Sequence, residues 1–277
     1  MSRSRSREMD LTTGSPFWSL LKFAIPVILG NLFQLFYTLA DSVIVGKTLG
    51  AESLAAVGST SIIIYFVFCF INGFTGGFGI CLGQRCGAKD EQGMRKSIAV
   101  STLLSIAFTV VLTLVCCLLS RQILVWMQIP DDISEEANAY MFVVLLGTGA
   151  TVFYNMISNM LRALGDSKTP LYFLILCSIL NVILDLISVI GLNMGVAGVA
   201  VATVGSQAIS AVICILVMFR KYPNLMPKRH TLRPDMPVSL KIFGMGAQMA
   251  LQSLFLSVGM MVITRVINGY GSNVVAA

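Results

Sequence analysis

The sequence predicts an all-α polytopic membrane protein, and its composition and its apolar runs both support this class. Of its 277 residues, 56% are hydrophobic and 12% are charged, whereas a soluble domain has roughly 45–50% and about 25%. Apolar stretches of about 20 residues recur between short polar breaks, and an α-helix of this length crosses ~30 Å of hydrocarbon. A water-soluble core cannot hold so many apolar residues, so the chain is interpreted as a series of membrane spans.

The apolar runs predict seven transmembrane helices and the start of an eighth. We place the seven at residues 17–46, 53–84, 94–120, 137–164, 170–192, 195–219 and 238–268. A polar, basic segment, 1–16, precedes the first span. That span is too long for a secretory signal and carries polar side chains, so we expect it to be a retained helix. The seven cysteines show no metal-ligand spacing, and we interpret them as packing residues.

The basic residues sort to one side of the predicted membrane. The segment before the first span and the loops after the second, fourth and sixth spans hold most of the Lys and Arg residues, whereas the opposite side holds Asp131, Asp132, Glu135 and Glu136. The positive-inside rule therefore predicts a cytoplasmic N-terminus and a cytoplasmic 220–237 segment. Cations spread over alternate loops do not form the dense basic face that binds nucleic acid, so we expect no nucleic-acid partner.

A weak internal repeat divides the chain into two parts. Residues 21–26 (LKFAIP) resemble 240–245 (LKIFGM), and 49–50 (LG) resemble 270–271 (YG), at offsets of 219 and 221. A repeat six spans apart enters the membrane in the same direction, as in transporters built from two parallel lobes. This predicts a six-helix first lobe over 17–219, a linker over 220–237, and the start of a second lobe over 238–277. A complete protein would have about twelve spans.

Two carboxylates, Asp41 and Asp185, fall inside predicted spans, where a charge costs ~2.5–3.5 kcal/mol on insertion scales. Each belongs to a stripe of polar residues spaced three or four apart along one helix face. Four stripes facing lipid would be untenable, so we expect them to face one another and line a cavity. The stripes are Asn31, Gln34, Tyr37 and Asp41; Ser178, Asn181, Asp185 and Ser188; Asn155, Asn159 and Arg162; Thr203, Gln207 and Ser210.

These polar groups have two readings. A lone Asn or Ser is more often a hydrogen-bonding contact between helices. For the two aspartates we favour a role in cation exchange, because a buried carboxylate without a basic partner takes up a proton or another cation. Arg162 is the one cation near the stripes, and contact with Asp185 would weaken this interpretation. Pro26 removes a helical hydrogen bond, so we expect a bend, and a hinge, in the first span.

Several short motifs occur along essentially the whole chain: 37–41 (YTLAD), 54–58 (LAAVG), 162–167 (RALGDS) with Pro170, and 181–185 (NVILD) followed by 195–198 (GVAG) and 202–203 (AT). Together they resemble the multidrug and toxic compound extrusion (MATE) family. The resemblance implies two six-helix lobes around a central cleft. It also implies a secondary antiporter that exports amphiphilic, often cationic compounds in exchange for protons or sodium ions. One departure is Leu186, where many relatives have Pro, so a bend there is in doubt.

The resemblance also implies which residues act. The positions that match the family's cation-coupling network are Tyr37, Asp41, Asn155, Asn159, Asn181, Asp185 and Thr203. We assign Asn31, Gln34, Ser188 and Gln207 to the substrate cavity, and we expect no metal and no cofactor beyond the coupling ion. The repeat aligns Asp41 with residues 260–262 (MMV), so coupling is expected in the first lobe. We expect a monomer, when full length, in the cytoplasmic membrane of a bacterium or another prokaryote.

Other functions remain as alternatives. A lipid-linked oligosaccharide flippase of the same superfamily should line its cavity with cations for a pyrophosphate, whereas these stripes carry carboxylates and amides. An intramembrane enzyme needs catalytic groups clustered near one interface, and we place Asp41 and Asp185 on spans of opposite direction. No phosphate-binding loop, serine elbow or metal motif is present in the sequence. A membrane scaffold without transport activity stays open.

Overall fold

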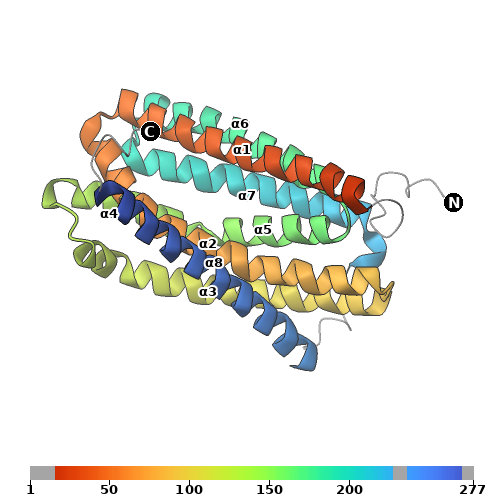
Figure 1. Ribbon diagram of the computed structural model, residues 1–277. Coiled ribbons are helices and arrows are strands. Elements are labelled where there is room, and N and C mark those ends of the chain that lie inside the picture. Colours follow the sequence, from red (N-terminus) through yellow and green to blue (C-terminus); the bar gives the residue numbers. More distant parts are fainter. Residues whose placement is uncertain (1–15, 227–235, 270–277) are drawn as a thin grey trace.

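In the computed structural model, residues 16–226 and 236–269 are described, with side chains described as far as residue 259, and all regular structure in these ranges is helical (Figure 1). The predicted all-α class is confirmed. The elements in chain order are α1 (Pro16–Thr48), α2 (Ala51–Gly87), α3 (Glu91–Trp126), α4 (Asp131–Leu146), α5 (Thr148–Ala163), α6 (Lys168–Leu186), the π-helical turn η2 (Ile187–Gly191), α7 (Gly195–Lys221), the 3-10 turn η3 (Pro223–Leu225) and α8 (Met236–Gly269).

The helices are long enough to span a bilayer. Six are of sufficient length and hydropathy, and α4 with α5 makes a seventh when the pair counts as one bent span. The distribution of side chains agrees, because large apolar residues face outward and small polar residues face inward. Leu118 is 80% exposed and Phe36 63%, whereas Thr75 and Ser105 are fully buried. The chain is therefore a multi-pass membrane protein, with the six-helix lobe and the following helix that the sequence predicts.

The single span predicted over 137–164 is wrong in detail. The structure has two 16-residue helices there, α4 and α5, with an angle of 44° between them. They meet at Gly147, where an added Cβ would lie 2.2 Å from a methyl carbon of Val204 on α7. The close contact requires glycine and fixes the bend. Helix α4 also begins earlier than expected, at Asp131, because two aspartates occupy its first turn and complement the helix dipole.

The predicted segment boundaries shift slightly. Helix α7 continues to Lys221 and α8 begins at Met236, so the 220–237 linker is shorter than expected. Helix α1 is one continuous helix past Pro26. The segment 1–15, most of the linker including His230, and the start of the eighth span at 270–277 lie outside the described residues. Leu186 stands where many relatives have a Pro that would bend the helix. In this structure the π-helical turn η2 begins at the next residue, Ile187.

Helix α2 lies at the centre of the packing and contacts α3, α4, α5 and α8. Helix α8 crosses it obliquely (Figure 1). Two glycines of α2 allow the backbones to meet. A Cβ on Gly77 would lie 2.5 Å from the Cα of Gly246, and one on Gly73 would lie 2.5 Å from the Cα of Ala250. These distances leave no room for a methyl group, so the crossing is a small-residue contact of the kind that associates helices in lipid.

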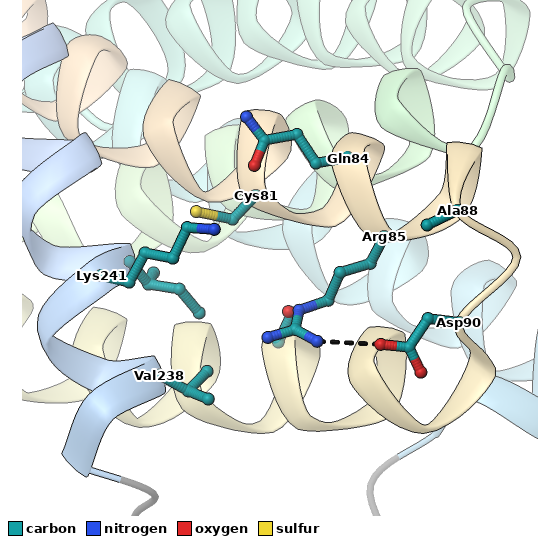
Figure 2. A pocket seen from close by; sticks show the side chains of 9 residues that line it. Cys81, Gln84, Arg85, Ala88, Asp90, Val238 and Lys241 are labelled. Atoms are coloured by element: carbon teal, nitrogen blue, oxygen red, sulfur yellow. Dashed lines mark hydrogen bonds and ion pairs between the residues drawn. The ribbon is translucent and has the colours of Figure 1, made fainter.

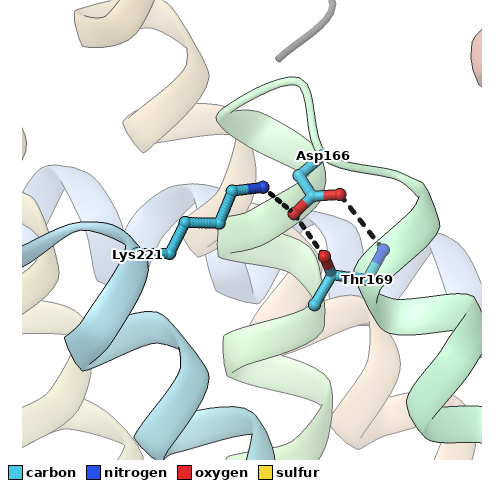
Figure 3. Close-up of polar contacts among 3 residues, drawn as sticks. All are labelled: Asp166, Thr169 and Lys221. Atoms are coloured by element: carbon cyan, nitrogen blue, oxygen red, sulfur yellow. Dashed lines mark hydrogen bonds and ion pairs between the residues drawn. The ribbon is translucent and has the colours of Figure 1, made fainter. Parts of the chain in front are cut away.

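A buried carboxylate joins two helix ends at the end of the bundle where α5 stops (Figure 3). Asp166 is 5% exposed. It accepts hydrogen bonds from the backbone N–H of Thr169 at 3.1 Å, from the Thr169 hydroxyl, and from the Lys221 ammonium at 2.6 Å. Burial by itself would raise the pKa of Asp166, but these donors more than compensate and hold the pKa below its ordinary value.

We expect Gly77→Ala to destabilise the protein and Gly76→Ala to leave it unchanged or slightly more stable. The methyl group at position 77 would separate α2 from α8 at a cost of about 1–3 kcal/mol. At position 76 nothing lies within 4 Å of an added Cβ, and alanine is the better helix former. Thermal unfolding in detergent measures both variants. Equal midpoints for the two would contradict the close crossing.

The ion pair of Asp166 predicts a pH dependence. Because its pKa is lower in the folded protein than in the unfolded chain, its contribution to stability is complete above the unfolded-state pKa of ~3.9 and is lost as the pH falls through the folded-state pKa. Asp166→Asn should therefore cost roughly 2 kcal/mol near neutral pH and reduce the loss of stability below about pH 4. The exposed Glu135→Gln serves as the control. An unaltered acid-unfolding profile in Asp166→Asn would refute this role.

Candidate functional site

The structure brings Asp41 of α1 and Asp185 of α6 together. Asp185 is fully buried, and the two carboxyl groups act on one another electrostatically as neighbours. No protein donor reaches Oδ1 of Asp41 or either carboxyl oxygen of Asp185. Among the described residues, neither carboxylate forms an ion pair. The pair therefore has unused oxygen acceptors on both sides, the arrangement that holds a shared proton or a bound cation.

Two tyrosines lie beside the carboxyl pair. Tyr37 lies one helical turn before Asp41 on α1, and Tyr140 of α4 is close enough to interact electrostatically with Asp41, Asp185 and Tyr37. Tyr140 also packs against the apolar cluster of Val45, Val189 and Val199. Sequence reasoning missed Tyr140 because it is a single polar ring in an ordinary amphipathic stretch. Only the packing of α4 against α7 places it at the site.

Asn181 and Thr203 form the wall next to Asp185. The Asn181 amide donates to the Thr203 hydroxyl at 3.4 Å, and the hydroxyl in turn donates to the Val199 carbonyl at 3.0 Å. Asn181 is 1% exposed, and its Oδ1 has no donor. Just past Asp185, η2 widens the helix and the Leu192 N–H bonds the Ile187 carbonyl at 2.9 Å. Turns of this kind are frequent at functional sites.

A polar cavity of about 100 Å³ begins at Tyr37 and extends between α1, α2, α5, α6 and α7. Three of the four predicted substrate residues, Asn31, Gln34 and Gln207, line it. Two predicted coupling residues, Tyr37 and Asn155, also line it, as do Asn72 and Thr151, which the sequence analysis did not select. The two aspartates do not line this cavity. Tyr37 and Cys177 connect it to the carboxyl pair, because both line the cavity and both interact electrostatically with Asp41.

Some predicted residues lie elsewhere. Asn159 donates to the Thr75 hydroxyl of α2 at 3.2 Å, so it joins two helices. Ser188 is buried in η2, near Gly198, and does not line the cavity. Arg162 lines the cavity and, in the described structure, forms no ion pair with Asp185. The condition that would have weakened the cation-exchange interpretation is therefore not met.

The expectation that Asp41 and Asp185 lie on spans of opposite direction is wrong. Asp41 and Asp185 belong to the first and fifth spans, which run in the same direction because successive spans alternate. Both lie near the C-terminal ends of their helices, in the same half of the bundle, and this shared depth allows them to meet. The directions of the spans therefore do not argue against an intramembrane enzyme, and the case for transport has to rest on the site and on similarity to known proteins.

Comparison with known proteins identifies the family. The MatE family model matches residues 26–187. The chain is 32% identical over 267 residues to the probable multidrug resistance protein YpnP of Bacillus subtilis, covering 96% of this chain and 60% of that protein. It is 27% identical over 266 residues to the probable multidrug resistance protein YoeA of the same organism, covering 94% and 58%.

Solved structures agree with this result. A multidrug resistance MATE family transporter of the MOP superfamily in the outward-facing conformation superposes with a TM-score of 0.87 at 26% identity, covering 96% of this chain and 59% of that one. The chain thus spans about 60% of the length of the proteins it matches. The resemblance seen in the motifs around Asp41 and Asp185 is confirmed, and the chain belongs to the MatE family.

Proposed function

We propose that this chain forms the cation-coupled part of a secondary antiporter that exports amphiphilic, cationic compounds in exchange for protons or sodium ions. The observation that carries the proposal is the Asp41–Asp185 pair, which lies inside the bundle, with Asp185 fully buried and without a basic partner among the described residues. We place the N-terminus in the cytoplasm of a prokaryotic cell and the protein in its cytoplasmic membrane, in agreement with the charge distribution of the loops.

The pair can bind a cation because two adjacent carboxylates that are shielded from water repel each other. They cannot both stay ionised unless a cation is bound between them. Either one carboxyl group holds a proton, or a cation lies between the oxygens. Binding drives transport only if the affinity differs between conformations. Helix α1 supplies that difference, because it carries Asp41 and Tyr37, and its residues Asn31 and Gln34 line the cavity. Movement of α1 relative to α6 would change the distance between the carboxyl groups and release the cation.

The alternatives have less support. A flippase for a pyrophosphate-linked lipid needs several cations in its cavity, and Arg162 is the one cation among the residues that line the cavity described here. In a scaffold without transport activity, two carboxyl groups inside the bundle without donors would only reduce stability, since unpaired acceptors are unfavourable there. We therefore propose transport, with the cavity as the place where a small amphiphilic substrate enters the first lobe.

Asp41→Asn and Asp185→Asn, each in a full-length protein that contains this chain, should abolish transport driven by an imposed proton or sodium gradient in liposomes. The amide preserves volume, so we expect stability to change by no more than about 1 kcal/mol. The double variant should be no worse than either single variant, because the carboxyl groups act as one unit. Solute uptake into the liposomes and the thermal midpoint are measured together.

Glu135→Gln at the start of α4 is the matched control, since it removes an exposed carboxylate that belongs neither to the pair nor to the lining of the cavity. Transport at the wild-type rate in both single variants would mean that the carboxyl groups are structural and that the proposed coupling site is wrong. Transport that persists with no gradient imposed would refute the antiport mechanism itself.

A further inference from the structure

A second polar pocket, of about 290 Å³, lies between α2, α3 and α8 (Figure 2). It includes the last turns of α2 and the first turns of α3 and α8, and so lies at the opposite end of the bundle from the Asp41–Asp185 pair. Arg85 comes from the last turn of α2, Ser97 from the beginning of α3 and Lys241 from the beginning of α8. The pocket belongs to no part of the proposed coupling site. Its lining residues come from two parts of the sequence, 81–97 and 238–242, which lie before and after the segment 227–235.

The charge of the pocket is positive. Arg85 contacts Asp90 at 2.9 Å, and the other Asp90 oxygen accepts from the Gly93 N–H at 2.8 Å, capping α3. The one carboxylate of the pocket, that of Asp90, is thus already bonded to the Arg85 guanidinium and to a backbone N–H in the first turn of α3. Lys241 forms no ion pair within the described part of the chain, and Figure 2 shows its side chain directed toward Cys81. Both cations act electrostatically on the Cys81 thiol.

Ser97 provides a separate indication of a ligand. Its side chain lines the pocket and is 1% exposed, yet its Oγ has no hydrogen-bond partner. A buried hydroxyl without a partner is unfavourable, and among the described residues Ser97 is the one such hydroxyl that lines this pocket. Arg85 also has unused capacity, because a guanidinium carries five N–H donors and only Nη1 contacts Asp90. Donors on α2, α3 and α8 therefore line one space, and its one carboxylate, that of Asp90, is already bonded to Arg85 and to the Gly93 N–H.

We propose that this pocket binds a phosphate group, with Lys241, the Ser97 hydroxyl and the free side of Arg85 as its donors. A phosphate offers several acceptor oxygens in different directions, whereas a single carboxylate is planar and fits one fork of donors. The group comes either from inorganic phosphate or from the headgroup of an anionic lipid, which is abundant at the cytoplasmic face that this end is predicted to meet. Once bound, it holds α8 to α2 beside the glycine crossing.

The test is thermal unfolding of the purified 277-residue chain in detergent. Inorganic phosphate is titrated against chloride at equal ionic strength, and micelles with phosphatidylglycerol are compared with micelles containing a neutral glycolipid. We expect one of the two phosphate sources to raise the midpoint by about 2–4 °C at saturating levels. Lys241→Gln and Ser97→Ala should each weaken binding roughly tenfold. Lys168→Gln, an exposed lysine at the same end of the bundle, should bind as the wild type does.

The two phosphate sources give different results according to the ligand that the pocket binds. Stabilisation by inorganic phosphate supports a free-anion site, and stabilisation by phosphatidylglycerol alone supports a lipid headgroup. Ser97→Ala removes an unpaired hydroxyl, so without phosphate it should unfold at or above the wild-type midpoint, which separates lost binding from lost folding. A wild-type midpoint that neither probe moves would overturn the proposal, and so would an equal rise in Lys241→Gln.

Discussion

Hydrocarbon offers no hydrogen-bond partners, and the rest of this structure follows from that constraint. Every backbone polar group in the spans has to be satisfied within a helix, so the regular structure described is helical. Large apolar side chains then cover the outside, and small polar side chains such as Thr75 and Ser105 turn inward. With lipid on the outside, close backbone contact rather than exclusion of water holds the helices together, as at Gly77 and Gly246.

The carboxyl pair is the exception that gives the lobe its chemistry. Asp41 and Asp185 are inside the bundle, as the constraint requires, but the protein supplies them with no donors. The positive charge that compensates these carboxylates therefore has to come from a proton or cation that binds reversibly. Tyr37 and Tyr140 border the pair, and the polar cavity starts at Tyr37. A residue change at the cavity can therefore reach the pair through Tyr37, or through Cys177, which also lines the cavity and interacts electrostatically with Asp41.

The sequence predicted the spans and the inward direction of the polar stripes that carry the aspartates for the same reason. Long apolar runs leave few alternatives to a membrane helix, and a carboxylate in such a run has to face other polar groups. The break at Gly147 was missed because it depends on the approach of Val204 from α7. Tyr140 belongs to no periodic pattern. Arg85 and Lys241 were treated as orienting charges, since no local signal reveals that α8 returns to the end of α2.

The break between α4 and α5 has a consequence for how the chain enters the membrane. Each helix has 16 residues, a length of about 24 Å, which is less than the ~30 Å of hydrocarbon. Neither can cross alone, so the insertion machinery has to accept them as one unit, with the surface at Gly147, whose backbone groups are already paired, left without its packing contact until a neighbour arrives. That neighbour is α7, which is synthesised later. The fourth span is therefore completed only after the sixth has been made.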